Sequence, residues 1–212
     1  MPKKKNTKKK TKKKKITPMI RQFLDIKDKH PDKIILFRMG DFYETFFDDA
    51  KVASKILGIT LTSRNKKNED EVPLAGFPYH ALNNYLDKLI KTGHKVAVCE
   101  QVEDPKKAKG IVKREIVNII TPGAIIDSNL IDKTDNNFLS VVFKQKKNSK
   151  KAGIASIDVS TSDFKFTDVY LVNLKSELAR IEPSEIIVLD NEMENLVQDL
   201  ELDFNLEVTF FE

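Results

Sequence analysis

The spacing of apolar and polar positions along the first half of the chain changes several times, and each change of period marks an expected element. Apolar residues recur at helical spacing in a first stretch that opens at Thr17-Pro18, in 41–58, and over about a dozen residues that end at Gly93. Short apolar runs typical of buried strands cover Lys33–Met39, 59–63, Lys95–Gln101 and 112–121. The pattern therefore predicts an α/β domain with a mixed sheet.

The pattern restarts at Asn137 with three short strands in succession. These are expected at about 138–143, 153–159 and 164–170, followed by a helix at 173–181, a strand at 185–189, another helix and a last strand at 206–211. Three antiparallel strands followed by α/β alternation predict the start of a ribonuclease-H-like sheet. Because such a domain usually carries further elements, we expect the second domain, 129–212, to be incomplete.

Charge separates a third segment from these two domains. Ten of the 37 basic residues are lysines within 3–15, and without them the net charge of +5 becomes −5. We interpret 1–16 as a disordered Lys-rich tail whose partner is a polyanion, or equally as a solubilising tail with no specific role. The first domain, 17–128, has 18 basic and 16 acidic residues, whereas 129–212 has 9 and 16. Any contact with nucleic acid is therefore expected in the first domain.

Composition excludes several classes of protein. With 40% hydrophobic residues, 13 Phe and only 7 Gly and 8 Pro, the chain has enough apolar material for a packed core. No apolar run reaches the roughly 18 residues of a membrane-spanning helix, and the N-terminus lacks the apolar stretch of a signal peptide. The single Cys99 and three scattered histidines form no ligand set of zinc spacing. We therefore expect a soluble cytoplasmic protein without a metal site.

The stretch from Arg38 to Phe46, RMGDFYETF, holds the candidate chemistry of the first domain. It places aromatic residues and a carboxylate at the start of the expected helix 41–58, directly after a glycine. Asp41 and Glu44 have the spacing of a capping box, in which both carboxylates satisfy amides at the helix start. In that interpretation Phe42 packs the helix against the sheet, and the whole motif has a structural role.

The segment GDFYE also resembles the Phe-x-Glu motif of the bacterial MutS mismatch-repair family. Three longer stretches resemble that family's N-terminal mismatch-recognition domain in the same order: TPMIRQFLDIKDKHPDKIILFRMGDFYETFFDDAKVASKILGITLTSR, PLAGFPYHALNNYLDKLIKTGHKVAVCEQVEDP and KGIVKREIVNIITPGAI. Together they cover essentially all of 17–128. From about 129, IASIDVSTSDFKF resembles the start of the family's connector domain.

The resemblance implies a role for both residues of the motif. Phe42 would be an aromatic wedge that stacks on a mispaired or unpaired base from the minor groove, and Glu44 would hydrogen-bond that base. A wedge unstacks and kinks the duplex, at a cost on the order of a few kcal/mol that is smallest where pairing is already defective. Further DNA-binding candidates are Arg38, Arg64, Lys66 and Lys67, which border this region, and Tyr79 in the family-like segment AGFPYH. An ordinary solvated charge, or loop packing for Tyr79, is the alternative for each.

The resemblance also implies the partners of the family. These are double-stranded DNA with mismatches or small loops, mismatch-repair partner proteins, and a second copy only in the full-length, dimeric protein. ATP and Mg²⁺ belong to a C-terminal ATPase domain, and the chain lacks G-x-x-x-x-G-K-[ST], since KTGHKVA has neither the first glycine nor the terminal hydroxyl residue. We therefore expect a nucleoid-associated protein that is not an enzyme, with no catalytic residue, no cofactor in this chain and no membrane partner.

Two other functions are compatible with the residues. Asp158 occupies a strand end where ribonuclease-H-like nucleases hold a metal-binding carboxylate, although two-metal catalysis needs several converging carboxylates and only Asp163 lies close in sequence. A pure protein-interaction module would use the acidic second domain for docking and would leave Phe42 in the core. Solvent exposure of the Phe42 side chain separates this last interpretation from DNA reading.

Overall fold

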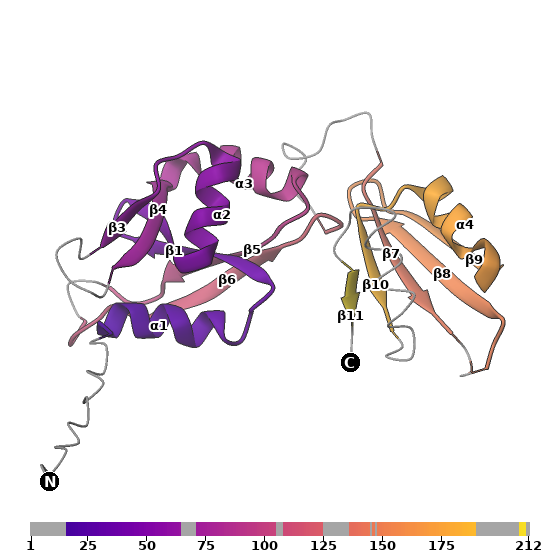
Figure 1. Cartoon of the computed structure of the whole chain (residues 1–212), viewed down its shortest axis with the longest axis horizontal. Coiled ribbons are helices and arrows are strands. Elements are labelled where there is room, and N and C mark those ends of the chain that lie inside the picture. The colour runs from indigo at the N-terminus through magenta and orange to yellow at the C-terminus, as the bar shows by residue number, and fades with distance from the viewer. Residues whose placement is uncertain are drawn as a thin grey trace, which may run out of the picture.

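The computed structural model describes residues 16–64, 71–104, 108–124, 136–144, 146, 148–189 and 208–210. These residues form two α/β units, each built on its own mixed sheet, which lie side by side along the chain (Figure 1). The predicted fold class, an α/β chain with a mixed-sheet first part and a ribonuclease-H-like second part, is confirmed. Among the helices of these residues, none is both long and apolar enough to cross a membrane. The expected tail at 1–15 lies outside the described residues.

The first unit contains six strands in the spatial order β3-β4-β2-β1-β5-β6. Its elements along the chain are α1 (Pro18–Lys27), β1 (Lys33–Met39), β2 (Phe42–Phe46), α2 (Phe47–Leu57), β3 (Thr62–Arg64), β4 (Val72–Pro78), the 3-10 turn η1 (Tyr79–Ala81), α3 (Leu82–Lys91), β5 (Lys95–Gln101) and β6 (Arg114–Ile120). Strands β1 and β5 are parallel, and all other neighbours in this sheet are antiparallel.

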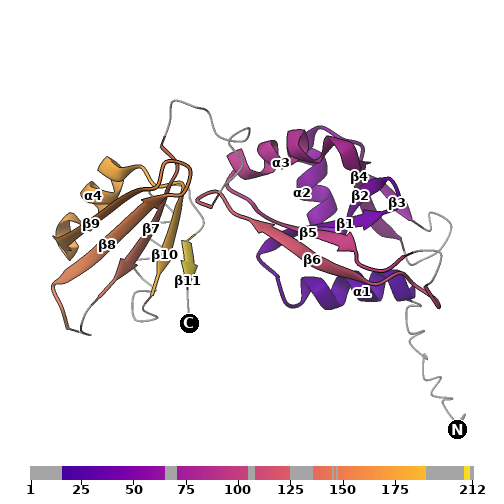
Figure 2. The same ribbon diagram turned by 180° about the vertical axis from the view of Figure 1, so that it is seen from behind.

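Helices cover both faces of the first sheet, with α1 on one side and α2 and α3 on the other (Figures 1 and 2). Helix α1 begins where the sequence predicted, because the Thr17 hydroxyl accepts a hydrogen bond from the Ile20 amide at 3.4 Å. Its Phe23 ring meets the rings of Phe37 and Phe46 edge-on, at centroid distances of 5.8 and 5.0 Å. This aromatic cluster attaches α1 to the centre of the sheet, directly beneath β1 and β2.

The predicted helix 41–58 is wrong over its first part, because Phe42–Phe46 is the strand β2 and helix α2 begins only at Phe47. Gly40 has a φ of +58°, which lets the chain reverse within two residues and pair β2 with β1. The capping box of Asp41 and Glu44 is therefore also wrong: the residue that caps α2 is Phe46, and its side chain makes no capping hydrogen bond.

Strand β4 is an element that the sequence pattern did not predict, and it pairs with β2 on one side and β3 on the other. It contains Pro73 and Pro78, which are atypical of a strand between two neighbours because proline cannot donate to the ladder. Pairing with β4 explains why 42–46 is a strand. A strand with partners on both sides satisfies its backbone amides, as a helix would satisfy them internally.

The second unit has five strands in the order β11-β10-β7-β8-β9. Its elements are β7 (Phe138–Phe143), β8 (Lys151–Asp158), β9 (Asp163–Tyr170), the 3-10 turn η2 (Leu171–Asn173), α4 (Leu174–Ile181), β10 (Glu185–Val188) and β11 (Val208–Phe210). The first three strands are antiparallel, whereas β7, β10 and β11 are parallel, as a ribonuclease-H-like sheet requires. The helix expected before the last strand lies outside the described residues.

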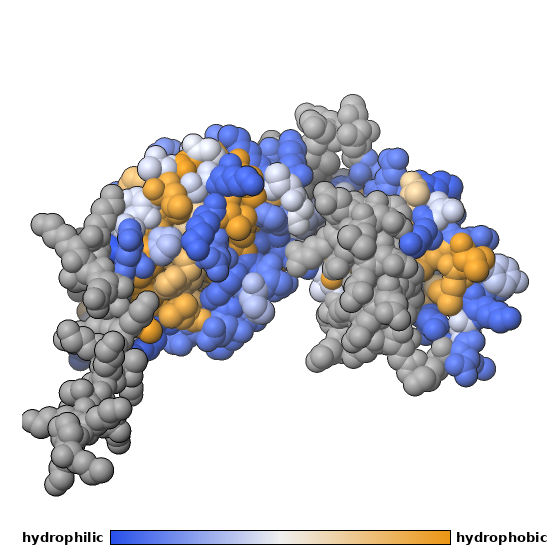
Figure 3. Space-filling view, in the orientation of Figure 1, coloured by the Kyte–Doolittle hydropathy of each residue, from blue (hydrophilic) through white to orange (hydrophobic). Residues whose placement is uncertain are grey.

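Hydrophobic residues of α4 pack on one face of this second sheet, where Leu174 and Leu178 meet Val142 and Ile154. Several large apolar side chains of the unit stay exposed, namely Phe164, Phe166 and Tyr170 on β9 and Val172 just after it. Hydrophobic surface is visible near α4 and β9 in the space-filling view (Figure 3). Strand β11, at the opposite edge of the sheet, faces the first unit, and the Lys95 ammonium donates a hydrogen bond to the hydroxyl of Thr209.

Asp158, the last residue of β8, is fully buried and closes the turn that leads to β9. Its carboxylate accepts hydrogen bonds from the Asn137 amide at 3.1 Å, the Ser160 amide at 2.9 Å, the Ser160 hydroxyl at 2.7 Å and the Thr161 amide at 3.3 Å. Burial alone would raise the pKa of Asp158, but these hydrogen bonds outweigh burial and lower the pKa below its usual 3.8.

Replacing this carboxylate, Asp158→Asn, should lower the free energy of unfolding by about 1–3 kcal/mol, because an amide cannot accept from all of these donors. The folded pKa lies below the unfolded one, so the ionised carboxylate stabilises the fold above the unfolded pKa. That stabilisation is lost as the pH falls through the folded pKa. Denaturant titrations should therefore show the parent and the variant converging below about pH 4.

The matched control is Asp163→Asn, since Asp163 lies nearby, is exposed and pairs with Lys165 at 3.0 Å. An exposed pair contributes little, so this change should alter the free energy of unfolding by less than about 0.5 kcal/mol. Equal losses for Asp158→Asn and Asp163→Asn would contradict the role given to the buried carboxylate.

Candidate nucleic-acid interface

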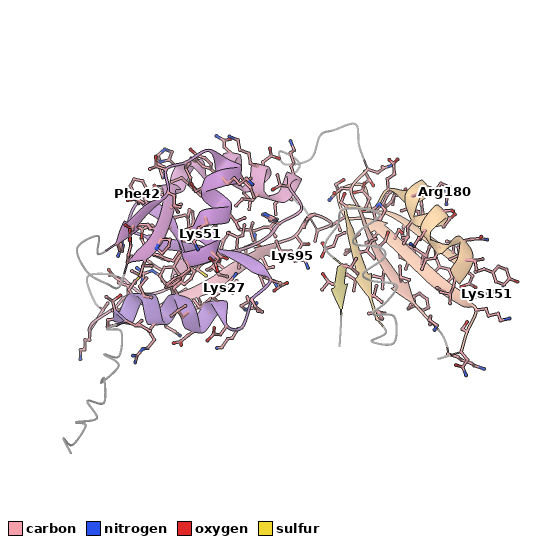
Figure 4. All side chains as sticks on the ribbon, viewed as in Figure 1. Lys27, Phe42, Lys51, Lys95, Lys151 and Arg180 are labelled. Atoms are coloured by element: carbon pink, nitrogen blue, oxygen red, sulfur yellow. The ribbon has the colours of Figure 1, made fainter. Side chains whose placement is uncertain are left out.

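Phe42 is presented by the tight turn between β1 and β2. It pairs with Met39 across this turn and with Pro78 of β4 on its other side. Its side chain is nevertheless 46% exposed, although the next residues of the strand lead straight into the core. The ring lies at the end of the first unit that is farthest from the second unit (Figure 4). An apolar ring at this position is open to a partner, and not buried as a staple for a helix.

Arg38 and Tyr79, both predicted as DNA contacts, support this turn. The Arg38 Nε donates to the Gly40 carbonyl at 2.5 Å, and the guanidinium carbon lies 3.9 Å from the centroid of the Tyr79 ring. The Tyr79 amide donates to the Asp41 carbonyl at 2.9 Å. The Tyr79 ring is itself 43% exposed, so it forms part of the same surface as Phe42 while it stacks on Arg38.

Further polar contacts, with Glu100 and through it with Tyr43, hold the Arg38 side chain in place. Its Nη1 lies 3.5 Å from the Glu100 carboxylate, which also accepts a hydrogen bond from the Tyr43 hydroxyl. Burial raises the pKa of Tyr43 to about 12, and this hydrogen bond and the charge of Glu100 act in the same direction. Tyr43 therefore stays a neutral donor at physiological pH. Neither Tyr43 nor Glu100 was among the site residues predicted from the sequence.

Glu44 lies two residues further along β2, on the same face of the strand as Phe42 and Phe46. Its carboxylate pairs with the Arg64 guanidinium, whose Nη2 is 3.0 Å from Oε2 and 3.3 Å from Oε1. Gly76 is its neighbour on β4, and a Cβ there would lie only 3.3 Å from the Glu44 Cγ and 2.8 Å from the Tyr43 carbonyl oxygen. The absence of a side chain at Gly76 therefore gives the Glu44 carboxylate its space.

Arg114 is a further cation of this site that the sequence did not single out. Its Nε donates to the Arg38 carbonyl at 2.5 Å and its Nη1 to the Val112 carbonyl at 2.8 Å. Burial lowers the pKa of Arg114, and the nearby charge of Glu44 partly opposes this effect. In the sequence, a basic residue at the start of a strand cannot be distinguished from an ordinary solvated charge. The contact of Arg114 with Arg38 follows from the order of the strands in the sheet.

The structure thus brings Arg38 and Tyr79 together at the turn that carries Phe42, and places Arg64 beside Glu44 on the same face of β2 as Phe42. The other two predicted residues, Lys66 and Lys67, lie outside the described residues. The arrangement offers an exposed aromatic ring beside a carboxylate, with arginine side chains around both. Such a surface can stack on a flat ring and exchange hydrogen bonds with its edge.

Other chemistry predicted as an alternative has less support in the structure. The oxygens of Asp158 are occupied by the amides and the hydroxyl of its own turn. Within the described part of the chain, no group of three or more His, Cys, Asp or Glu residues could hold a metal ion. Cys99 is buried in the core, and burial raises its pKa to about 12, so it stays a protonated thiol.

Two family models match this chain, one over each unit. The family model described as MutS domain I matches residues 17–129, and the one described as MutS domain II matches residues 137–210. Among curated relatives, the DNA mismatch repair protein MutS of Ruminiclostridium cellulolyticum is 46% identical over 204 residues, which are 93% of this chain and 23% of that protein.

Two further relatives carry the same name. Those of Chlorobaculum parvum and Chlorobium chlorochromatii are 48% and 50% identical over 183 and 179 residues, which are 86% and 84% of this chain and 21% and 20% of theirs. The chain thus spans between a fifth and a quarter of the length of the curated relatives it matches. On these matches, the chain belongs to the MutS family.

Proposed function

We propose that this chain supplies the mismatch-reading surface of a DNA mismatch-repair protein. In this proposal Phe42 enters the minor groove of double-stranded DNA and stacks on a mispaired or unpaired base, while Glu44 accepts a hydrogen bond from that base. The observation that carries the proposal is the placement of an exposed phenylalanine and a carboxylate two residues apart on one face of β2. The relatives, all named for mismatch repair, support the same conclusion.

The proposed surface distinguishes mismatched from normal duplex by how easily each can be deformed. Inserting a ring between base pairs unstacks one step and kinks the duplex, which costs least where a base pair is already defective. The minor groove reports only a degenerate sequence code, which suits a protein that must act in any sequence context. The chain therefore needs one rigid wedge and one polar probe, and β2 offers both.

The placement of Phe42 also bears on the alternative of a pure protein-interaction module. That alternative required Phe42 in the core, whereas nearly half of its side chain is in contact with solvent. The homodimer, the mismatch-repair partner proteins and the ATP- and Mg²⁺-dependent steps are proposed for a full-length protein of this family, and not for these residues by themselves.

A wedge must be exposed before DNA arrives, so Phe42→Ala should change the free energy of unfolding of the 212-residue chain by less than about 1 kcal/mol. The matched control is Phe46→Ala, on the same face of the same strand but fully buried, which should cost about 3–5 kcal/mol. Chemical denaturation measures both values. If Phe42→Ala unfolds the chain as Phe46→Ala is expected to, Phe42 belongs to the core and the proposal fails.

The two motif residues should affect DNA binding differently. In a full-length MutS protein that carries residues 17–210 as its first two domains, Phe42→Ala should abolish the preference for mismatched over normal duplex. Glu44→Gln should raise the affinity for normal duplex and so reduce the mismatch-to-normal ratio, because it removes a negative charge that otherwise offsets the positive charge of the neighbouring Arg64. Titrations of labelled duplexes with and without one mismatch give both ratios. Unchanged selectivity in both variants would rule out this function for the motif.

The isolated chain should bind DNA weakly and with little preference for mismatches, since residues 17–212 carry a net charge of −5. Most of its affinity should come from the lysines of 3–15, so deleting 1–15 should remove most of the binding and flatten its dependence on salt. Titrations of normal and mismatched duplex at several salt concentrations test this expectation. Tight, mismatch-selective binding by the shortened chain would contradict it.

A further inference from the structure

We propose that Arg64 is an exchangeable counter-ion of Glu44, which moves to a DNA phosphate when Glu44 accepts a hydrogen bond from a mispaired base. This inference rests on the proposed function and adds a means of regulating the same site. In this inference the contact between Arg64 and a phosphate depends on the state of Glu44, whereas a simple phosphate contact would form regardless of Glu44.

The contacts of the arginines at this site distinguish Arg64 from the other two. Arg38 and Arg114 each donate to backbone carbonyls, which fixes their guanidinium groups in the turn and in the sheet. The hydrogen bonds that the structure gives to Arg64 go to the side chain of Glu44, and both leave from Nη2. Among the residues that the structure describes, the hydrogen bonds of the Arg64 guanidinium therefore depend on the Glu44 side chain and not on the backbone.

The position of Arg64 allows it to move. It is the last residue of β3, the edge strand of the first sheet, and its side chain is 39% exposed. The guanidinium carbon lies 5.9 Å from the centroid of the Phe46 ring. Because Phe46 and Glu44 lie two residues apart on one face of β2, this contact places the guanidinium near Glu44. The Glu44 side chain is only 17% exposed, so water and salt compete mainly for the Arg64 guanidinium, which is the more exposed partner. A phosphate offers the same guanidinium a bidentate, charge-assisted contact.

Charge balance supplies the coupling between the two residues. While Arg64 holds Glu44, the pair is neutral, so the carboxylate can approach phosphates without strong repulsion. On a normal duplex the base donors are engaged in pairing, and Glu44 keeps Arg64. A mispaired base presents an N–H group that is not engaged in pairing. When this group donates a hydrogen bond to the Glu44 carboxylate, it replaces the Arg64 guanidinium, which can then bind a phosphate. Recognition of one base therefore adds one contact between Arg64 and the DNA backbone.

The salt dependence of binding counts such contacts. The affinity falls as salt is added, and each phosphate neutralised on B-DNA adds about 0.9 to the magnitude of the slope of log K against log salt concentration. In a full-length MutS protein that carries residues 17–210 as its first two domains, the slope for a mismatched duplex should therefore exceed that for a normal duplex by about 0.9. Arg64→Gln should remove this difference and reduce the mismatch-to-normal ratio, whereas Arg64→Lys, which keeps the charge, should retain part of it.

The matched control is Arg180→Gln. Arg180 also pairs with a glutamate, Glu177, at 2.5 Å, but it lies on α4 of the second unit. This change removes the same charge and the same kind of ion pair, and it should leave the slope difference as it is in the parent. A loss of the difference in Arg180→Gln as well would show that net charge, and not exchange at Glu44, produces it.

Glu44→Gln tests the exchange from the other side and does not depend on whether Arg64→Gln folds. Without the carboxylate, Arg64 is free on any duplex, so the slope for normal duplex should rise to the value for mismatched duplex. Adding Arg64→Gln to Glu44→Gln should cancel this rise, and a strictly additive pair of effects would overturn the inference.

The failure of the exchange and the failure of the proposed function are distinguishable. If Phe42→Ala abolishes selectivity while Arg64→Gln keeps the slope difference, only the exchange is wrong. If Phe42→Ala keeps full selectivity, the proposed function is wrong.

Discussion

Strand β2 exchanges backbone hydrogen bonds with β1 on one side and β4 on the other, and its two-residue period fixes which side chains reach solvent. Tyr43 points to the core beneath α2 and α3, and Phe46 points to the core beneath α1. Phe42 and Glu44 share the face of Phe46, but Phe42 is 46% exposed at the start of the strand and the Glu44 side chain is 17% exposed, whereas Phe46 is fully buried. A slip of one residue would bury Phe42 and Glu44 and expose Tyr43, so the register of β2 decides whether this surface exists.

Electrostatic compensation is the second condition for the site. In the proposed function Glu44 comes close to phosphates and needs nearby positive charge; Arg64 is in contact with it, and Arg114 is within electrostatic reach. The turn beside it is held by a separate set of charges, in which Glu100 accepts from Tyr43 and pairs with Arg38. Because the two acidic residues have different partners, a change at the Glu44 pair leaves the support of Phe42 intact.

Much of the fold followed from the sequence pattern, for identifiable reasons. Helix α1 was marked by Thr17-Pro18, β1 and β5 by apolar runs, and β7, β8 and β9 by the strand pattern that restarts at Asn137. The start of α2 was misplaced because Asp41 and Glu44 have helix-capping spacing, and because the apolar residues of FYETFF fit helical spacing as well as a strand. Pairing with β4 resolves that ambiguity, and it involves residues about thirty positions away.

The site was predictable only in part. Phe42, Glu44, Arg38, Arg64 and Tyr79 were chosen from a family motif and its surroundings, but their contacts depend on which strands are neighbours. Arg64 reaches Glu44 only because β4 lies between β3 and β2, an order that residue spacing does not contain. For the same reason the supporting roles of Gly76, Glu100 and Arg114 became visible only in the folded chain.

The position of Phe42 at the first residue of a central strand has a mechanical consequence. A ring at the tip of a long loop would yield when a stiff duplex pressed against it. In the proposed function the duplex would press on the end of β2, where the hydrogen bonds to β1 and to β4 together resist sliding of the strand. A closely packed sheet with low compressibility lies behind the ring. The chain therefore has a stiff support behind the ring that, in the proposed function, bends the DNA.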